Sequence, residues 1–350
     1  MHRGDEGLGF LLRYENVAWY ESGEVRILDR RIYPRQIRFV SCRSHREVAS
    51  AIRDMVTQSA GPYTAAGMGM ALAAYECRDK KREEQRLYLR EAAERIATAR
   101  PTTENRMRLI TGGCLEAAEK AMRSGVKADR AIFEATLESL ERRYRRMSEV
   151  AKYLVDLFPR EGSLMTQCFG ETIVGTMLRE ARERNLSLRL FCPETRPYLQ
   201  GARLTASLAA DMGFEVFVVT DNMAAAMMQK EKIDLFTSAA DRICLDGHIV
   251  NKIGTFQLAI LAKYFALPYF VTGIPDADRL FVDQVRMEER DPSEVLMAGG
   301  KRHTAEGVQA RYPSFDITPP HLISGIVTDK GIYAPYDLGR YFETETERFY

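Results

Sequence analysis

A few reactive or charged residues stand alone inside otherwise apolar segments of this 350-residue chain. Two of them can move protons, namely Cys168 in MTQCFGE and Asp241 in SAADRI. A thiol or a carboxyl acts as a general acid or base when its surroundings set a suitable pKa. The others can bind an anion or neutral oxygens through charged or amide groups. They are Arg100 in ATARPTTEN, Arg196 and Gln200 in CPETRPYLQGARLTA, and Asn251 with Lys252 in VNKIGT.

An Asp-Gly pair at residues 246–247 separates two short apolar runs, RICL and HIVN. This pattern is typical of a β-hairpin with a two-residue turn. In that register Ile243 faces Val250, and Asp241 faces Lys252. The hairpin is therefore expected to bring the acid beside Lys252 and the asparagine before it, just ahead of an apolar helix.

The periodicity of the apolar residues changes near residue 150. After a short β-rich start, residues from about 45 to 157 show helical spacing. Beyond residue 160, short apolar strands alternate with helices of roughly 10 to 15 residues, which predicts right-handed crossovers and a parallel sheet. We therefore expect an α/β protein with a mostly helical domain at residues 1–150 and a parallel-sheet domain at residues 151–350.

Ligands of open parallel sheets bind beyond the carboxyl ends of the strands. Cys168 ends the first expected strand, LMTQC, and Asp241 follows the fourth, LFTSA. The thiol and the acid are therefore expected at the same edge of the sheet. A structural role is the alternative for both, since a lone cysteine that ends a buried strand is commonly a core residue, and a lone aspartate before an arginine is commonly a surface or capping acid.

Composition argues against nucleic acid and membrane as partners. The 50 basic and 49 acidic residues leave no basic excess, so the arginines of ERRYRRM are interpreted as a solvated helix face. No apolar run reaches the roughly 18 to 20 residues that a membrane-spanning helix needs. Six cysteines without CxxC spacing, and an N-terminus unlike a secretory signal, indicate a reduced, cytoplasmic protein.

The sequence also lacks the familiar cofactor motifs. There is no GxxxxGK[ST] segment, no GxGxxG that opens a helix after a strand, and no HExxH. A P-loop nucleotide enzyme, a nicotinamide enzyme and a metal site are therefore disfavoured. We expect no cofactor.

Several phrases of the sequence resemble those of the methylthioribose-1-phosphate isomerases. They are ARPT, ETRPYLQGARLTA, ADRI, NKIGTFQLA and ITPPHLISGIVTDKGIYAP, and the resemblance runs from about residue 15 to 338. That family also includes ribose-1,5-bisphosphate isomerases and the regulatory subunits of the exchange factor for translation initiation factor 2. The resemblance implies a helical N-terminal domain, a Rossmann-like C-terminal domain and a homodimer. It also implies an aldose–ketose isomerisation of a pentose 1-phosphate without metal or nicotinamide.

The resemblance further implies roles for single residues. Cys168 and Asp241 match the catalytic pair. Substrate-holding positions fall on Arg100, Gln200, Asn251, Lys252, and on Gln58, Ser59 and Ala60 of TQSAGPYTAAG. An acid near the ring oxygen can assist ring opening and later act as a base, while a thiol carries a proton between C2 and C1, unless a hydride moves instead. The expected substrate is S-methyl-5-thioribose 1-phosphate of methionine salvage, with 5-deoxyribose 1-phosphate and ribose 1,5-bisphosphate as alternatives.

The sequence departs from the family's pattern before its first apolar helix. The family segment, close to RGAPAIG, carries an arginine where this chain has Gln58, so one expected phosphate-binding cation is missing. The segment FGETIVGTM after Cys168 is also shorter than usual, and Ala239 replaces a glycine. Two other functions therefore stay open. One is a regulator of the same fold that senses a sugar phosphate or a nucleotide, and the other is an unrelated oxidoreductase.

Overall fold

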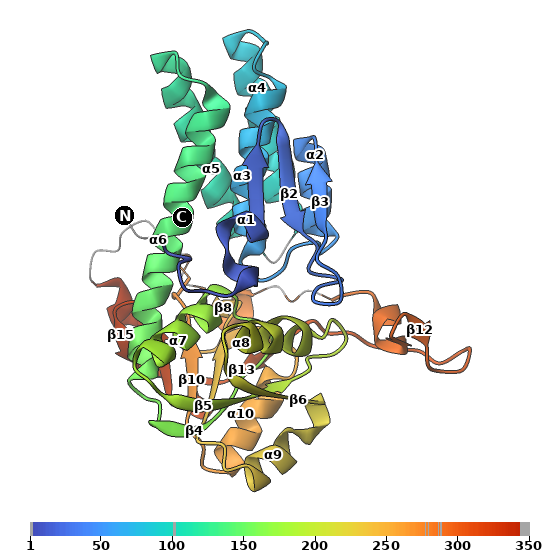
Figure 1. Ribbon diagram of the computed structural model, residues 1–350, viewed down its shortest axis with the longest axis vertical. Coiled ribbons are helices and arrows are strands. Elements are labelled where there is room, and N and C mark those ends of the chain that lie inside the picture. Colours follow the sequence, from blue (N-terminus) through green and yellow to red (C-terminus); the bar gives the residue numbers. More distant parts are fainter. Residues whose placement is uncertain are drawn as a thin grey trace. The chain divides into compact units, whose positions relative to one another are not determined.

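The computed structural model describes residues 3–100, 103–276, 278, 280–285, 287 and 289–343. The chain divides into two compact units, unit 1 within Met1–Arg145 and unit 2 within Arg146–Thr346 (Figure 1). The division falls inside helix α6 (Ala128–Val155), which supplies residues to both units. Each unit has a hydrophobic core of its own.

Unit 1 is mostly helical and begins with a small antiparallel sheet in the order β1-β2-β3. The sheet packs on α3, which also contacts α2, α4 and α5. Helix α3 is buried from Gly61 to Ala74 because its sequence, GPYTAAGMGMALAAYE, is small or apolar on every side. Besides α6, the elements are η1 (Phe10–Leu12), α1 (Tyr14–Val17), β1 (Ala18–Glu21), β2 (Glu24–Leu28), β3 (Phe39–Cys42), α2 (His45–Arg53), α3 (Gly61–Glu76), α4 (Arg82–Ala97) and α5 (Glu104–Ser124).

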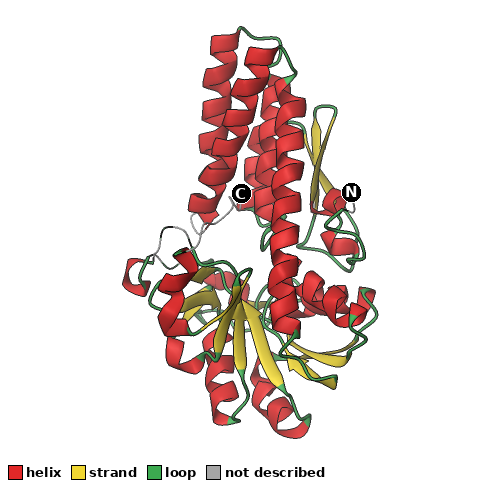
Figure 2. Ribbon diagram, turned by 90° about the vertical axis from the view of Figure 1, so that its left-hand side faces the viewer, coloured by secondary structure: helices red, strands yellow, loops and turns green. Residues whose placement is uncertain are grey.

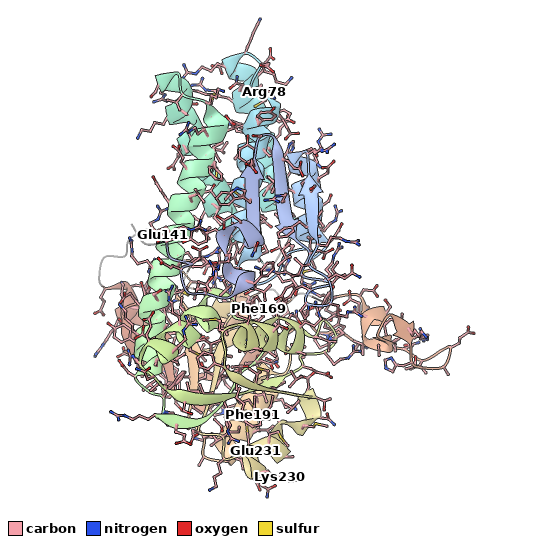
Figure 3. The ribbon with its side chains drawn as sticks, in the orientation of Figure 1. Arg78, Glu141, Phe169, Phe191, Lys230 and Glu231 are labelled. Atoms are coloured by element: carbon pink, nitrogen blue, oxygen red, sulfur yellow. The ribbon has the colours of Figure 1, made fainter. Side chains whose placement is uncertain are left out.

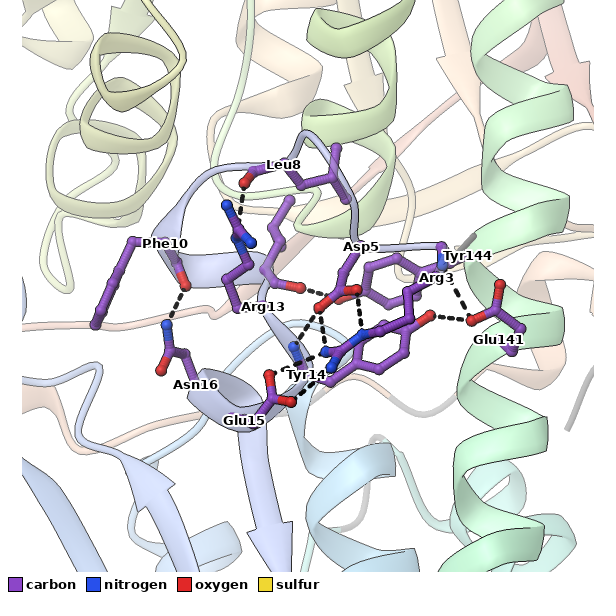
Figure 4. Close-up of polar contacts among 12 residues, drawn as sticks. Arg3, Asp5, Leu8, Phe10, Arg13, Tyr14, Glu15, Asn16, Glu141 and Tyr144 are labelled. Atoms are coloured by element: carbon purple, nitrogen blue, oxygen red, sulfur yellow. Dashed lines mark hydrogen bonds and ion pairs between the residues drawn. The ribbon is translucent and has the colours of Figure 1, made fainter. Parts of the chain in front are cut away.

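Polar contacts hold the start of the chain against α6 within unit 1 (Figure 4). The Tyr14 hydroxyl donates to Glu141 Oε2 at 2.5 Å. Arg3 forms ion pairs with Asp5 and Glu15, both at 2.7 Å. Asp5 also accepts the backbone N–H of Tyr14 at 2.9 Å. The chain from Arg3 onward therefore belongs to the fold of unit 1.

Unit 2 contains a seven-stranded sheet in the order β15-β14-β10-β7-β4-β5-β6. All pairings from β14 to β6 are parallel, and β15 is antiparallel to β14. The parallel strands follow the doubly wound order 3-2-1-4-5-6 of a Rossmann sheet, which confirms the predicted α/β fold class. The strands are β4 (Glu161–Met165), β5 (Ser187–Pro193), β6 (Glu215–Val219), β7 (Leu235–Ala239), β10 (Tyr269–Thr272), β14 (Gly325–Thr328) and β15 (Gly331–Tyr333).

Helices lie on both sides of this sheet (Figure 2). Helix α7 packs against α8, and α9 packs against α10. Their bounds are α7 (Thr172–Glu183), α8 (Ser207–Asp211), α9 (Ala224–Lys230) and α10 (Thr255–Tyr264). The short helices are η3 (Gly201–Ala206), η4 (Asp221–Met223), η5 (Val282–Gln284), η6 (Pro292–Leu296), η7 (Pro320–Leu322) and η8 (Pro335–Phe342).

The predicted hairpin is present, but its predicted register is wrong by one residue. Ile243 pairs with Ile249 rather than with Val250, so Asp241 lies nearer in register to Asn251 than to Lys252. The turn is one residue longer than expected because Gly247 adopts a φ of 81°, the left-handed residue that closes a three-residue loop. The hairpin and a distant strand form the sheet β13-β9-β8, with β8 (Arg242–Ile243), β9 (Ile249–Lys252) and β13 (Phe315–Thr318), and a separate pair joins β11 (Met297–Ala298) to β12 (Lys301–Arg302).

Candidate functional site

The strand order of the unit 2 sheet reverses between β4 and β7. Ligands of such sheets bind at this point, in the crevice outside the carboxyl ends of the two strands. Strand β4 leads into the loop that carries Cys168, and β7 leads into Asp241. The Cys168 loop touches the end of β7, since a Cβ atom added to Gly170 would lie 3.2 Å from the Cβ of Ala239. The topology therefore brings the expected thiol and acid to the place where a ligand is expected.

Cys168 lies in a strained loop between β4 and α7. Its φ is 57° and that of Glu171 is 49°, in a region that residues other than glycine rarely adopt. The Thr205 hydroxyl donates to the carbonyl oxygen of Cys168, and Gln167 Nε2 donates to the carbonyl oxygen of Ile253 at 3.0 Å. Strain that is held by surrounding contacts is a feature of functional sites.

Figure 3 locates this loop within unit 2. Phe169, the residue after Cys168, lies at one edge of the unit, and Lys230 and Glu231 at the end of α9 lie at the opposite edge. The Cys168 loop thus occupies the edge formed by the carboxyl ends of the strands.

Charged groups from two other segments act on the Cys168 thiol. Burial raises the pKa of the thiol to about 12, the positive charge of Lys252 lowers this pKa, and the negative charge of Asp241 raises it. The thiol is therefore protonated near neutral pH. Asp241 itself is exposed to solvent, while Cys168 is half-buried. The three residues come from separate segments of the chain and are close enough to interact electrostatically.

Strand β9 ends in two buried polar residues, Asn251 and Lys252, whose exposed fractions are 5% and 6%. Asn251 Nδ2 donates to the Thr255 hydroxyl at 3.0 Å, and that hydroxyl donates to the Lys252 carbonyl at 2.7 Å. The Lys252 ammonium lies 4.3 Å from the centre of the Phe315 ring, a cation–π contact that stabilises a charge with little water around it. A cation held in this way is suited to bind an anionic group.

Asp316 lies next to this cation and was not predicted from the sequence. Its carboxylate accepts the N–H groups of Gly254 at 2.7 Å and Phe256 at 3.1 Å, so it caps α10. Burial raises the pKa of Asp316 to about 6, although these hydrogen bonds and Lys252 lower it. The N-terminus of α10 is thus satisfied by the protein's own carboxylate rather than kept open for a phosphate. Asp316 lies 60 positions after Phe256, whose N–H it accepts, so no local sequence pattern predicts that it caps this helix.

The loop after β5 carries Gln200 and continues into a π-helix, η3. The sequence predicted an ordinary α-helix here, and the difference matters because single π-helical turns are frequent at functional sites. A Cβ atom on Gly201 would lie 1.8 Å from the carbonyl oxygen of Pro193, so only glycine fits at the start of this turn. Asp221 holds the same loop by accepting the N–H groups of Thr195 and Arg196, both at 2.8 Å.

Arg196 has a structural role in this arrangement. Its Nη2 atom donates to the carbonyl oxygens of Val295 at 3.2 Å and Met297 at 2.8 Å. The segment that contains η6 is therefore fixed to the loop after β5. A hydrogen bond at 2.9 Å from the Tyr198 hydroxyl to Glu294 Oε1 adds to this connection.

Several polar atoms near this edge have no hydrogen-bond partner in the part of the chain that the structure describes. They include Gln167 Oε1, Thr172 Oγ1, Gln200 Oε1 and the Tyr312 hydroxyl. Each of these four belongs to a side chain that is at most 5% exposed. Buried polar groups are nearly always paired with protein, water or a ligand, so these atoms can accept a polar ligand.

The other expected site residues lie in unit 1. Gln58, Ser59 and Ala60 form the turn before α3, and Gln58 is only 2% exposed. Arg30 Nη1 donates to the Gln58 carbonyl at 2.6 Å, and Arg143 Nη1 donates to the Ala60 carbonyl at 3.2 Å. Two arginines from distant segments thus surround a turn that lacks the family's own arginine, and nothing in the local sequence predicted either.

Arg100 follows α4 in unit 1, is 9% exposed, and accepts the Thr103 N–H through its carbonyl oxygen at 3.3 Å. The structure therefore groups the expected residues by unit. Cys168, Asp241, Asn251 and Lys252 cluster in unit 2 with Gln200 on a loop of the same edge, while Gln58, Ser59 and Ala60 share a turn in unit 1.

Two further properties concern only the described residues. No three side chains of His, Cys, Asp or Glu among them converge as ligands of a metal ion would. Among their helices, none combines the length and the apolar character that crossing a membrane requires.

Known proteins match this sequence along nearly the whole chain. The sequence profile of the Initiation factor 2 subunit family matches residues 58–335. A methylthioribose-1-phosphate isomerase from Roseiflexus castenholzii is 34% identical over 340 residues, which cover 91% of this chain and 95% of that protein.

Two solved structures have a similar fold. The 5-methylthioribose 1-phosphate isomerase from Pyrococcus horikoshii OT3 has a TM-score of 0.80 and 30% identity, covering 94% of this chain and 96% of its own. Subunit delta of the translation initiation factor eIF-2B from A. fulgidus has a TM-score of 0.78 and 28% identity, covering 92% and 97%. The resemblance found in the sequence predicted both relatives, the isomerase and the initiation-factor subunit. The chain therefore belongs to the Initiation factor 2 subunit family, and its curated relatives at 34% identity are sugar-phosphate isomerases.

Proposed function

We propose that this protein isomerises S-methyl-5-thioribose 1-phosphate to S-methyl-5-thioribulose 1-phosphate, an aldose–ketose conversion of methionine salvage. The observation that supports it most strongly is the electrostatic interaction of Cys168, in the loop after β4, with Asp241, which follows β7, and with Lys252, the last residue of β9. The 34% identity to an isomerase of this name supports the same substrate.

Asp241 acts first as an acid in the proposed reaction. The phosphate on C1 prevents the ring from opening as a free aldose would, so the bond between C1 and the ring oxygen must break with assistance. Protonated Asp241 donates its proton to the ring oxygen as this bond breaks, and C1 becomes an oxygen-stabilised cation. The resulting carboxylate then accepts the proton of the C2 hydroxyl when the ketone forms. Its exposed position lets it exchange protons with water between turnovers.

Cys168 moves the second proton. Its thiolate removes the hydrogen of C2 as a proton, and the electrons of that bond form the C1–C2 double bond and neutralise the cation. The thiol then returns the proton to C1 while the C2 hydroxyl becomes the carbonyl. Burial raises the pKa of this thiol to about 12, which makes the thiolate scarce but strongly basic, and Lys252 lowers the pKa and stabilises the thiolate.

The remaining substrate-binding roles are proposed from residue chemistry and resemblance. Lys252 supplies a positive charge for the phosphate, while Asn251 and Gln200 offer neutral hydrogen-bonding groups. The unpartnered Oε1 atom of Gln200 supports its role, because a sugar hydroxyl would satisfy it. The roles of Arg100, Gln58, Ser59 and Ala60 rest on the resemblance alone.

We further propose a cytoplasmic homodimer. Strand β6 is the last strand of its sheet, and it exposes Phe217 and Val218, the latter by 51%. Helix α10 exposes Phe256, Ile260 and Tyr264. Apolar side chains on an open sheet edge and on an exposed helix face favour a contact with a second copy. The six free cysteines support a reducing compartment.

Incubation of the purified protein with methylthioribose 1-phosphate, 5-deoxyribose 1-phosphate and ribose 1,5-bisphosphate, followed by carbon NMR, tests the proposal. We expect a ketose 1-phosphate from the first sugar, and in D₂O we expect deuterium at C1, because the thiol proton exchanges with solvent. Deuterium at C1 would exclude a direct hydride shift, which carries the hydrogen of C2 to C1 without exchange. Binding without conversion of any sugar would point instead to a regulator.

A further inference from the structure

We propose that the hydroxyl of Tyr312 binds the substrate in the Cys168–Asp241 site, where it donates a hydrogen bond to a sugar oxygen next to the carbon at which Cys168 acts. Nothing in the sequence distinguished Tyr312 from an ordinary core tyrosine. The inference rests on the proposed isomerase function and adds a residue to it.

The hydroxyl of Tyr312 lies in surroundings that favour a ligand. Tyr312 is 5% exposed, and its hydroxyl has no hydrogen-bond partner among the described residues. Buried tyrosine hydroxyls normally find a partner, because leaving one unpaired costs folding free energy. A bound ligand supplies the partner that the described residues do not.

Two hydrogen bonds connect the segment of Tyr312 to that of Cys168. Two residues after Tyr312, the Ser314 carbonyl accepts the N–H of Ile253 at 3.0 Å. The carbonyl of Ile253 in turn accepts Gln167 Nε2 at 3.0 Å, and Gln167 precedes Cys168. Strand β13, which begins at Phe315, is paired residue by residue with β9 and its Lys252. Tyr312 is therefore held close to the proposed reacting groups.

The electrostatic surroundings agree with this location. Burial raises the pKa of the Tyr312 phenol far above its ordinary value, Arg290 opposes the shift, and Glu294, Tyr198 and Cys168 add to it. The same side chain thus lies within range of the loop after β5 and of the Cys168 thiol. A phenol of this kind stays protonated at any pH at which the protein works, so it remains a hydrogen-bond donor.

The chemistry defines which part of the ligand the hydroxyl meets. A neutral donor beside the thiol suits a sugar oxygen better than a phosphate, which requires charge. While Cys168 removes the C2 proton, electron density shifts in the C1–C2 region, and a fixed donor there stabilises the transition state more than the bound substrate. Loss of the hydroxyl should therefore lower kcat more than it raises KM.

The test compares Tyr312→Phe with Tyr341→Phe. Tyr341 is a matched control in unit 2, 1% exposed, but its hydroxyl is already paired with Asp329 Oδ1 and Arg146 Nη2, both at 3.0 Å. We expect Tyr312→Phe to keep or raise the Tm and to lower kcat for methylthioribose 1-phosphate by about tenfold to a hundredfold. We expect Tyr341→Phe to lower the Tm and to keep kcat within about twofold of the wild type, because it loses hydrogen bonds away from the substrate.

The outcomes separate this inference from the proposed function. If the wild type converts the sugar and Tyr312→Phe retains kcat within about twofold, the inference is wrong while the isomerase function stands. If the wild type binds the sugar without converting it, the rise in Tm that the ligand causes becomes the readout. A smaller rise for Tyr312→Phe then supports the contact, and an equal rise overturns it. Absence of both conversion and binding in the wild type refutes both proposals.

Discussion

At the scale of single residues, Cys168 combines a strained backbone with a strongly perturbed side chain. Its φ is 57°, and burial raises the pKa of its thiol to about 12. Lys252 lowers that pKa and Asp241 raises it. Opposing charges beside one thiol are expected of a proton carrier, which must both take up and release its proton. The other five cysteines are buried, and opposing charges act on two of them, Cys77 and Cys244, as well.

Alkylation by iodoacetamide, followed for each cysteine by mass spectrometry, measures this pKa without any substrate. Below pH 12 we expect the rate at Cys168 to rise about tenfold per pH unit, because only the thiolate reacts. Asp241→Asn removes a negative charge, lowers the pKa and should speed alkylation about threefold at fixed pH. Lys252→Met should slow it by a similar factor. Equal rates in the two variants would show that the three groups do not interact.

The resemblance located Cys168 and Asp241 from sequence, because each lies in a short motif at the end of an apolar strand. Tyr312 and Asp316 could not be found in this way. Asp316 caps a helix that begins 61 residues earlier in the chain. Tyr312 is distinguished by its unpaired hydroxyl and by neighbours that come near only in the folded chain. Long-range pairing leaves no periodic trace in a single sequence.

At the scale of elements, the π-helix η3 positions Gln200, and a single glycine makes it possible. The Cβ atom of an alanine at position 201 would collide with the Pro193 carbonyl oxygen at 1.8 Å and approach the Thr195 hydroxyl at 2.9 Å. A backbone carbonyl cannot rotate away as a side chain can, so the loop after β5 and the π-helix must separate.

Gly201→Ala should therefore lower the free energy of unfolding by at least about 2 kcal/mol in urea titrations. Gly112→Ala is the control, since a Cβ atom there meets nothing within 4 Å and the residue lies inside α5. That substitution should raise stability by about 0.5 to 1 kcal/mol, because alanine favours helix. A tolerated alanine at position 201 would show that η3 does not pack as described.

Strands β4 to β10 of the large sheet were predictable because apolar runs alternate with helical segments after residue 160. The same reasoning gave the hairpin but not its register, since the sequence does not reveal whether Asp-Gly closes a two-residue or a three-residue loop. Strands β13 to β15 were not predicted. They have three or four residues each, and β13 is recognisable only beside its partner β9, more than 60 residues away.

At the scale of the whole molecule, the two units divide the expected site residues between them, and unit 2 carries the groups proposed for proton transfer. Unit 2 also carries the exposed apolar edge of β6 and α10. The parallel sheet thus has two functions in this account, the alignment of the reacting groups at its carboxyl edge and association through its last strand.

The proposed dimer can be tested with two valines of nearly equal exposure. Val218 on β6 is 51% exposed, and Val126, between α5 and α6, is 52% exposed. We expect Val218→Asp to halve the molar mass measured by light scattering, because a charge on the apolar edge opposes pairing, and Val126→Asp to leave it unchanged. A wild type of monomer mass, or a Val218→Asp variant that stays dimeric, would refute the assignment of this edge.

The central claim is that one thiol and one carboxyl together move the protons of an aldose 1-phosphate. The most direct test is the rate at which methylthioribulose 1-phosphate forms. It is measured for the wild type, Cys168→Ser, Asp241→Asn and the buried-thiol control Cys192→Ser. We predict a decrease of at least about a thousandfold for the first two variants, with unchanged circular dichroism, and a rate close to wild type for Cys192→Ser. A Cys168→Ser or Asp241→Asn enzyme that keeps a tenth or more of the wild-type rate would contradict the account.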